Sequence, residues 1–196
     1  MNETRSPKEL AILCATLRLL SGGAELHALK MSAIALEAGI GKGTIYEYFP
    51  SKEDLFRQAL LYCMEQEQRE FELRLRQCPD FKSAIYALFT LVKTNCANPM
   101  SSFRLMLSGM SPEQRPFVGL CSNEVFRAHM EDSERQLHSL LQRGINEGVL
   151  SPATEPCYRS LALKAAVAAY VLPGFPETPD DALKDIAWSI LLKILS

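Results

Sequence analysis

This chain of 196 residues has few of the residues and motifs on which most enzymes depend. It contains only three histidines, His27, His129 and His138. There is no G-x-S-x-G nucleophile motif, no H-E-x-x-H zinc motif and no phosphate-binding glycine loop. The sequence therefore predicts neither an enzyme nor a protein that needs a cofactor or a metal ion.

Long hydrophobic runs are also missing. The longest is Ala165–Leu172, whereas a helix that crosses a bilayer needs about 20 apolar residues. The first residues, Met1–Glu9, include no hydrophobic segment of the kind found in secretory signals. We expect a cytoplasmic protein that makes no contact with membranes.

The cysteines form no metal-binding or redox pattern. No two of them make a C-x-x-C pair, and small disulfide frameworks belong to short secreted chains. We expect reduced thiols that mostly pack as small apolar side chains. The six are Cys14, Cys63, Cys78, Cys96, Cys121 and Cys157.

The net charge of −2 is not the basic balance typical of a nucleic-acid-binding protein. Residues 1–52, however, carry six basic and five acidic side chains, so the acidic excess lies in the remainder. Lys30, Lys42 and Lys52 could face phosphates while an acidic body limits non-specific binding. The charge pattern permits DNA binding without requiring it.

Almost every segment has the periodicity of an amphipathic helix, and capping residues mark the helix ends. Ser6–Glu9 reads as a capping box with proline at the first helical position, and Ser51–Asp54 resembles another. No hairpin signal and no internal repeat is present. We predict an all-α protein of about nine helices, at residues 7–22, 31–38, 42–48, 51–77, 79–97, 100–109, 122–146, 156–172 and 178–195.

Residues 31–48 form the most informative segment. Two short helices are joined by a tight turn at Ala38–Ile40, in which Gly39 supplies a left-handed residue. Ile40 and Ile45 would fix the second helix to its neighbours and leave its polar side chains outside. This arrangement predicts a helix-turn-helix, whose second helix enters the major groove of DNA. The side chains left for DNA are Lys42, Thr44, Tyr46 and Tyr48.

The alternative is that Tyr46, Tyr48 and Phe49 are core aromatics of an ordinary helix bundle. Taken alone, the three rings favour that alternative. Their combination with nearby glycines, Lys42 and Lys52 favours DNA binding instead.

The run A-G-I-G-K-G-T-I-Y-E-Y-F-P-S-K-E-D-L-F, from Ala38 to Phe56, resembles the DNA-binding signature of the tetracycline-repressor (TetR) family of bacterial transcription regulators. The resemblance implies a DNA-binding domain at residues 1–50 and a helical ligand-binding and dimerisation domain at residues 51–196. By position, it implies base or backbone contacts for Lys42, Gly43 and Thr44, and phosphate contacts for Tyr46, Tyr48 and Lys52.

Two residues depart from the family pattern. Lys30 stands where a hydroxyl residue usually opens the second helix, so a cap is lost but a phosphate contact is gained in its place. Gly41 stands where serine is frequent, which removes one phosphate ligand. The resemblance therefore implies a DNA-binding set of Lys30, Gly41, Lys42, Gly43, Thr44, Tyr46, Tyr48 and Lys52.

The last two helices are apolar on several sides, and such helices must be buried. Paired with their copies they would form a four-helix interface about a two-fold axis, as in the family. Burial within one protomer is the alternative. The interface residues we expect are Leu161, Ala165, Ala168, Ala169, Leu172, Trp188, Leu191 and Leu195.

Phenylalanines and methionines gather in the middle helices. They could line an adaptable pocket for an apolar or amphipathic effector, or they could simply form a core, and helical spacing does not separate the two. The residues are Phe89, Phe103, Met106, Met110, Phe117, Phe126 and Met130.

We therefore expect a homodimeric transcription regulator, a repressor that a small effector releases from a palindromic DNA operator. A helical protein-binding adaptor without DNA binding is the alternative, and an enzyme is a more remote one. The sequence names neither the effector nor the operator, and it does not separate repression from activation.

Overall fold

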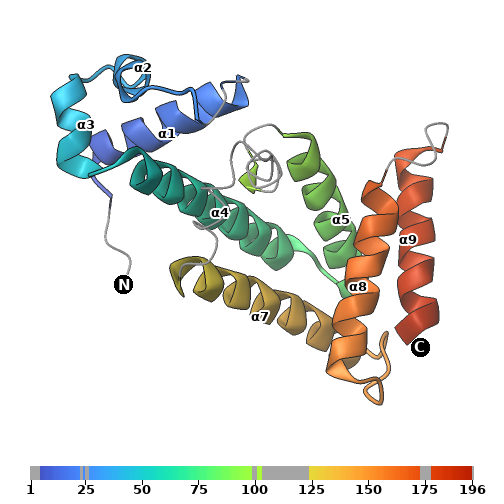
Figure 1. The fold of residues 1–196 in the computed structure, drawn as a ribbon. Coiled ribbons are helices and arrows are strands. Elements are labelled where there is room, and N and C mark those ends of the chain that lie inside the picture. Colours follow the sequence, from blue (N-terminus) through green and yellow to red (C-terminus); the bar gives the residue numbers. More distant parts are fainter. Residues whose placement is uncertain are drawn as a thin grey trace. The chain divides into compact units, whose positions relative to one another are not determined.

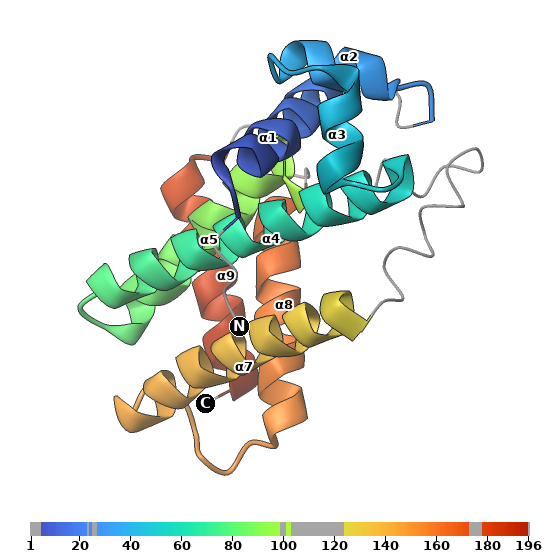
Figure 2. The same cartoon turned by 90° about the vertical axis from the view of Figure 1, so that its left-hand side faces the viewer.

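The computed structural model describes residues 5–22, 24, 27–98, 101–102, 124–172 and 178–195, without the side chains of Val125 and Phe126. All regular structure in these ranges is helical, which confirms the predicted all-α class (Figure 1, and turned by 90° in Figure 2). None of the described helices is long and apolar enough to span a bilayer. The helices are α1 Pro7–Ser21, α2 Met31–Glu37, α3 Lys42–Tyr48, α4 Lys52–Gln77, α5 Phe81–Ala97, α7 Glu124–Asn146, α8 Pro156–Val171 and α9 Asp180–Leu195.

The capping residues place the helix ends within two residues of the predicted positions. Ser6 Oγ accepts a hydrogen bond from Glu9 N at 3.2 Å, and the Glu9 carboxylate accepts one from Ser6 N at 3.3 Å, so the capping box is complete. Ser51 Oγ accepts from Asp54 N at 3.1 Å at the start of α4. The helix predicted over 100–109 lies, except for residues 101 and 102, outside the described part of the chain.

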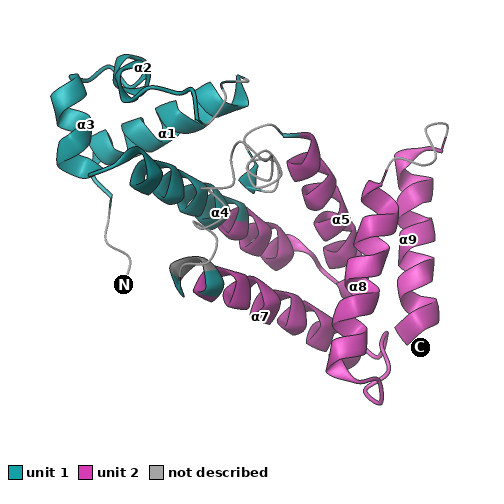
Figure 3. Cartoon of the chain, in the orientation of Figure 1, with its two compact units in different colours: residues 1–67, 98–127 teal, residues 68–97, 128–196 magenta. Residues whose placement is uncertain are grey.

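The chain divides into two compact units, and helix α4 contributes to both (Figure 3). Unit 1 comprises residues 1–67 and 98–127, and unit 2 comprises residues 68–97 and 128–196. The first half of α4 thus packs with the N-terminal helices. The functional boundary at residues 50 and 51 stays a prediction.

Unit 1 has an apolar core in which all of its N-terminal helices take part. Leu13 of α1, Ile34 of α2, Ile45 of α3 and Leu55 of α4 are fully buried in one cluster. Because each of the four helices contributes a residue to this cluster, its burial orients all four helices at once.

Unit 2 is built from α5, α7, α8, α9 and the second half of α4. Its core contains Phe81, Phe89, Leu163 and Leu191, all fully or almost fully buried. Helix α7 approaches α5 closely at Gly144, where an added Cβ would lie 2.8 Å from the Phe81 ring. Only glycine fits against this ring without displacing it.

Asp180, the first residue of α9, fastens three helices of unit 2 together. Its carboxylate accepts hydrogen bonds from Lys184 Nζ at 2.8 Å, from Tyr170 Oη of α8 at 2.8 Å and from Lys93 Nζ of α5. The Lys93 ammonium also lies 4.9 Å from the centre of the Tyr170 ring. The two lysines, Lys184 first, hold the pKa of Asp180 well below its usual range.

Replacing this carboxylate should make the stability of unit 2 less dependent on pH. We expect Asp180→Asn to lower the free energy of unfolding at pH 7 by about 1 kcal/mol, a modest value because the side chain is 45% exposed and water screens it. Since the folded pKa lies below the unfolded value of about 3.9, the contribution is present above pH 4 and is lost as the pH falls further. Urea denaturation should therefore show a smaller difference between variant and wild type at pH 3 than at pH 7. Asp181→Asn, at a 95% exposed position, is the matched control.

Candidate DNA-binding surface

Helix α3 is held by two buried residues, one within it and one just past its end, and it leaves Lys42, Gly43 and Tyr46 exposed. Ile45 and the following Phe49 are fully buried in the unit 1 core. Tyr46 is 48% exposed, and Tyr48 is half-buried beside the core. Of the three aromatics that could have been core residues, only Phe49 is one. Tyr46 is available to a partner.

The turn before α3 has the geometry that its glycine predicts. Gly39 adopts φ +69°, a left-handed conformation that strains any other residue with a Cβ. Ile40 N donates to Ala35 O at 3.0 Å and Ala38 N donates to Ile34 O at 2.9 Å, which closes the end of α2. The turn therefore fixes the angle at which α3 leaves α2.

The predicted DNA-contacting residues lie on or beside this motif. Lys30 is exposed at the N-cap of α2 and makes no side-chain cap, as its departure from the family pattern implies. Gly41 is the N-cap of α3, and it too provides no side-chain cap. Lys42 and Gly43 are exposed and Thr44 is half-buried. These placements agree with a DNA-facing surface, although each individual contact stays a prediction.

Lys52, at the start of α4, has a structural contact that the sequence did not reveal. Its Nζ donates to the carbonyl oxygen of His27 at 2.7 Å and lies 5.5 Å from the centre of the Phe56 ring. Partial burial lowers the pKa of Lys52. The ammonium group thus ties the α1–α2 loop to α4 and keeps further N–H groups for another acceptor.

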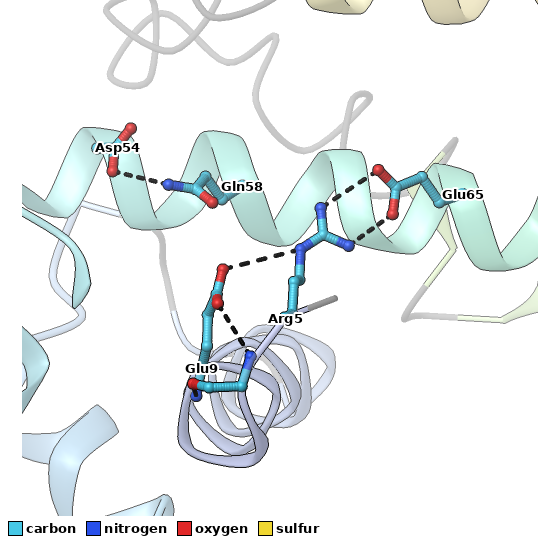
Figure 4. Close-up of polar contacts among 6 residues, drawn as sticks. Arg5, Glu9, Asp54, Gln58 and Glu65 are labelled. Carbon is cyan, nitrogen blue, oxygen red and sulfur yellow. Dashed lines mark hydrogen bonds and ion pairs between the residues drawn. The ribbon is translucent and has the colours of Figure 1, made fainter. Parts of the chain in front are cut away.

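A second tie joins the start of α1 to the middle of α4 (Figure 4). The Arg5 guanidinium donates to both carboxylate oxygens of Glu65, at 2.6 and 3.2 Å, and lies 5.3 Å from the centre of the Tyr62 ring. The hydrogen bond with Glu65 is the main reason that the pKa of Arg5 is raised. A bidentate pair of this kind fixes both distance and orientation, so α1 and the first half of α4 move together.

Few of the predicted effector-pocket residues fall in the described part of the chain. Phe89 is fully buried and lies against Tyr170 with ring centres 5.3 Å apart, whereas Met130 is 44% exposed. Phe103, Met106, Met110, Phe117 and the side chain of Phe126 are outside the described residues. The pocket therefore stays a prediction.

An open groove of about 420 Å³ does lie between the second half of α4 and α7, in unit 2. A hydrogen bond from Gln136 to Glu72 crosses from one helix to the other beside it. Phe89 and Met130, the two predicted effector residues with described side chains, are not among the residues that line this groove.

The predicted dimer residues divide into two groups. On α8, Leu161 is 64% exposed and Leu172, just past its end, is 68% exposed, and the alanines between them at 165, 168 and 169 are also exposed. On α9, Leu191 and Leu195 are fully buried inside unit 2, so they leave no surface for a partner. Trp188 is half-buried against the Phe81 ring, 5.7 Å between centres.

The outward apolar residues of α9 are instead Ile186 and Ile194, which are 52% and 48% exposed. The two isoleucines are eight positions, or roughly two turns, apart, so they lie on the same side of the helix. Periodicity shows that α9 is apolar on several sides, and only the packing of α5 and α8 decides which side is covered.

Comparison with known proteins agrees with this fold and surface. A sequence model of the bacterial regulatory proteins of the tetR family matches residues 12–59. The HTH-type transcriptional regulator YhgD of Bacillus subtilis (strain 168), described as uncharacterized, is 25% identical over 145 residues, which make up 74% of this chain and 71% of that protein.

Two solved structures share the fold. The fatty acid degradation regulator FadR from Bacillus halodurans has a TM-score of 0.70 at 18% identity, over 97% of each chain. FadR from Bacillus subtilis, in a complex with stearoyl-CoA, has a TM-score of 0.66 at 18% identity, over 95% of this chain and 97% of that one.

The helix pair α2–α3, its outward polar face and the matched domain define a helix-turn-helix transcription regulator. DNA, and not a reaction substrate, is what this motif is built to bind. Residues 12–59, which extend from α1 into α4, thus match the DNA-binding domain of the tetR family of bacterial regulatory proteins. The expected all-α fold and the expected helix-turn-helix domain of a transcription regulator are thus confirmed.

Lys42 and Lys52 should respond differently to removal of the ammonium group. Lys42→Ala should weaken DNA binding, reduce the slope of log affinity against log salt by about one, and leave stability unchanged within about 0.5 kcal/mol. Lys52→Ala should weaken DNA binding and also lower the free energy of unfolding by about 1 kcal/mol, because the His27 carbonyl loses its donor. Salt-dependent DNA titration and urea denaturation measure the two effects. A Lys52→Ala protein as stable as wild type would contradict the structural role.

Proposed function

We propose that this regulator is a homodimeric repressor that binds a palindromic operator and leaves it when a small apolar or amphipathic effector binds. The observation that carries the proposal is the outward face of α3, which is exposed while Ile45 and Phe49 anchor the helix. In the proposed complex α3 lies in the major groove. Lys42, Tyr46 and Tyr48 contact phosphates and Thr44 contacts a base edge or a thymine methyl group.

The dimer is supported by the exposed apolar residues of the last two helices. Helices α8 and α9 pack against each other in unit 2, and they leave Leu161, Leu172, Ile186 and Ile194 about half or more exposed. Apolar groups of this size gathered on neighbouring helices favour association with a matching surface. A two-fold partner would cover them with the same residues of its own α8 and α9.

The effector class is supported by one of the structural relatives, because FadR from Bacillus subtilis is in a complex with stearoyl-CoA. We propose that effector binding acts on DNA through α4. This helix begins at Lys52, four residues after α3 ends at Tyr48, so a tilt of α4 would reorient α3. A coupling free energy of about 1–3 kcal/mol would change DNA affinity about 5- to 150-fold.

Two neighbouring carboxylates on α4 offer a route for that coupling. Glu65 holds Arg5 before α1, and Glu67 accepts a hydrogen bond from Ser102 N at 2.9 Å. Ser102 directly precedes Phe103, one of the residues proposed for the pocket. A displacement of this segment would therefore act on the same turn of α4 that fastens α1.

Selection from random duplex DNA tests the operator proposal directly. We expect the wild-type protein to enrich a palindrome whose half-sites are centred about 10–10.5 base pairs, or a multiple of that, apart. Tyr46→Ala should weaken binding to the enriched sequence about tenfold, because one exposed contact is lost. If the wild type enriches no palindrome, the operator proposal fails, and the result favours the alternative of a protein-binding adaptor without DNA binding.

A charged substitution on the exposed apolar face of α8 tests whether that face lies in the dimer interface. We expect Leu161→Glu to weaken dimerisation about 100-fold or more, because the interface would bury an unpaired carboxylate. Operator affinity should fall with it, since a monomer presents a single recognition helix. Leu73→Glu, at a 60% exposed leucine of α4, is the matched control and should remain dimeric. Sedimentation velocity measures both variants. A Leu161→Glu dimer as tight as wild type would place the interface elsewhere.

A further inference from the structure

We propose that Glu47 determines the base preference of the operator, by accepting a hydrogen bond from the N4 amino group of a cytosine in the major groove. The proposal rests on the proposed binding of α3 to operator DNA and goes further by naming the base and the residue that reads it.

The rotation of α3 places Glu47 at the centre of its outward face. Ile45 is fully buried, so it marks the inward direction. Gly43 and Glu47 each lie two positions from Ile45, which is about 160° around an α-helix. Both are exposed. Thr44 and Tyr48 lie closer to the inward direction, and both are half-buried.

Gly43 lets the backbone of α3 approach another surface closely at this face. A Cβ built at Gly43 would meet no other atom within 4 Å, so nothing in the described structure requires glycine there. Its φ is not in the left-handed region either, since Gly39 and Gly148 are the glycines with positive φ among the described residues. The side chain that extends furthest from the middle of this face is then Glu47, one turn later.

Glu47 is an uncompensated charge within the motif. Residues 31–48 contain two acidic side chains, Glu37 and Glu47. Glu37 Oε1 accepts a hydrogen bond from Arg18 Nε at 2.8 Å. Within the described ranges, Glu47 takes part in no hydrogen bond or ion pair. Its full negative charge therefore faces the polyanion that α3 binds, and this repulsion lowers affinity for every sequence that offers no compensating donor.

The major groove offers such a donor at cytosine. Guanine presents only acceptors there, thymine presents an acceptor and a methyl group, and adenine sets an acceptor beside its amino group, so each of these repels a carboxylate more than cytosine does. Glu47 thus favours cytosine at one position of each half-site and penalises the other three bases.

The test compares operators selected by the wild type, Glu47→Ala and Glu47→Gln, followed by affinities for single-base variants at each position. For the wild type, replacing the cytosine at one position per half-site should cost about 5- to 150-fold in affinity. For Glu47→Ala the same replacement should cost less than about twofold, while affinity for random DNA rises. Glu47→Gln should move the preference at that position toward adenine, which a glutamine side chain matches.

Two control variants distinguish a failure of the proposed role of Glu47 from a failure of operator binding by α3. Glu155→Gln, at the exposed N-cap of α8, changes the net charge equally and should keep the wild-type base preference. Lys42→Ala should weaken binding to all sequences alike. If the wild type selects a palindrome and Glu47→Ala retains every base preference, the role of Glu47 is overturned and operator binding stands. If the wild type selects no palindrome, the operator proposal itself fails.

Discussion

Burial of Ile45 and Phe49 is the constraint on which the DNA-binding surface depends. Helix α3 has only seven residues, too few to be stable alone, so its conformation and its rotation both come from tertiary contacts. With Ile45 fully buried, the direction of every other side chain on α3 follows from the helical repeat. The left-handed Gly39 fixes the entry of α3, and the buried Phe49 fixes its exit. A surface of small and polar residues is thereby held rigidly.

Helix α4 extends this constraint to the rest of the chain. Its first half supplies Leu55 and Phe56 to the unit 1 core, and its second half belongs to unit 2. Two polar contacts orient this packing further. Lys52 donates a hydrogen bond to the carbonyl oxygen of His27, and Arg5 donates one to the carboxylate of Glu65. A regulator needs such a shared element, since an effector site and a DNA site can influence each other only through parts that respond to both.

Local signals account for most of what the sequence predicted well. Capping residues such as Ser6 and Ser51 satisfy backbone groups within three or four positions, so their effect on helix ends is visible in the sequence. The interface residues of α9 were harder. Leu191 and Ile194 are equally apolar, yet the first is buried in unit 2 and the second is 48% exposed. The internal contact of Lys52 was also hidden, because His27 lies 25 residues away in the sequence.

The sequence by itself determined the all-α class, the helix boundaries and the helix-turn-helix family, because these depend on periodicity, caps and a compact motif of glycine, lysine and tyrosine. Only the tertiary structure decided which faces remain exposed. The contacts of Ile45 with α1, α2 and α4 decide whether Tyr46 or Phe49 belongs to the core. They also decide which residue lies at the centre of the outward face of α3. Contacts of that kind join residues far apart in the sequence, and no local pattern encodes them.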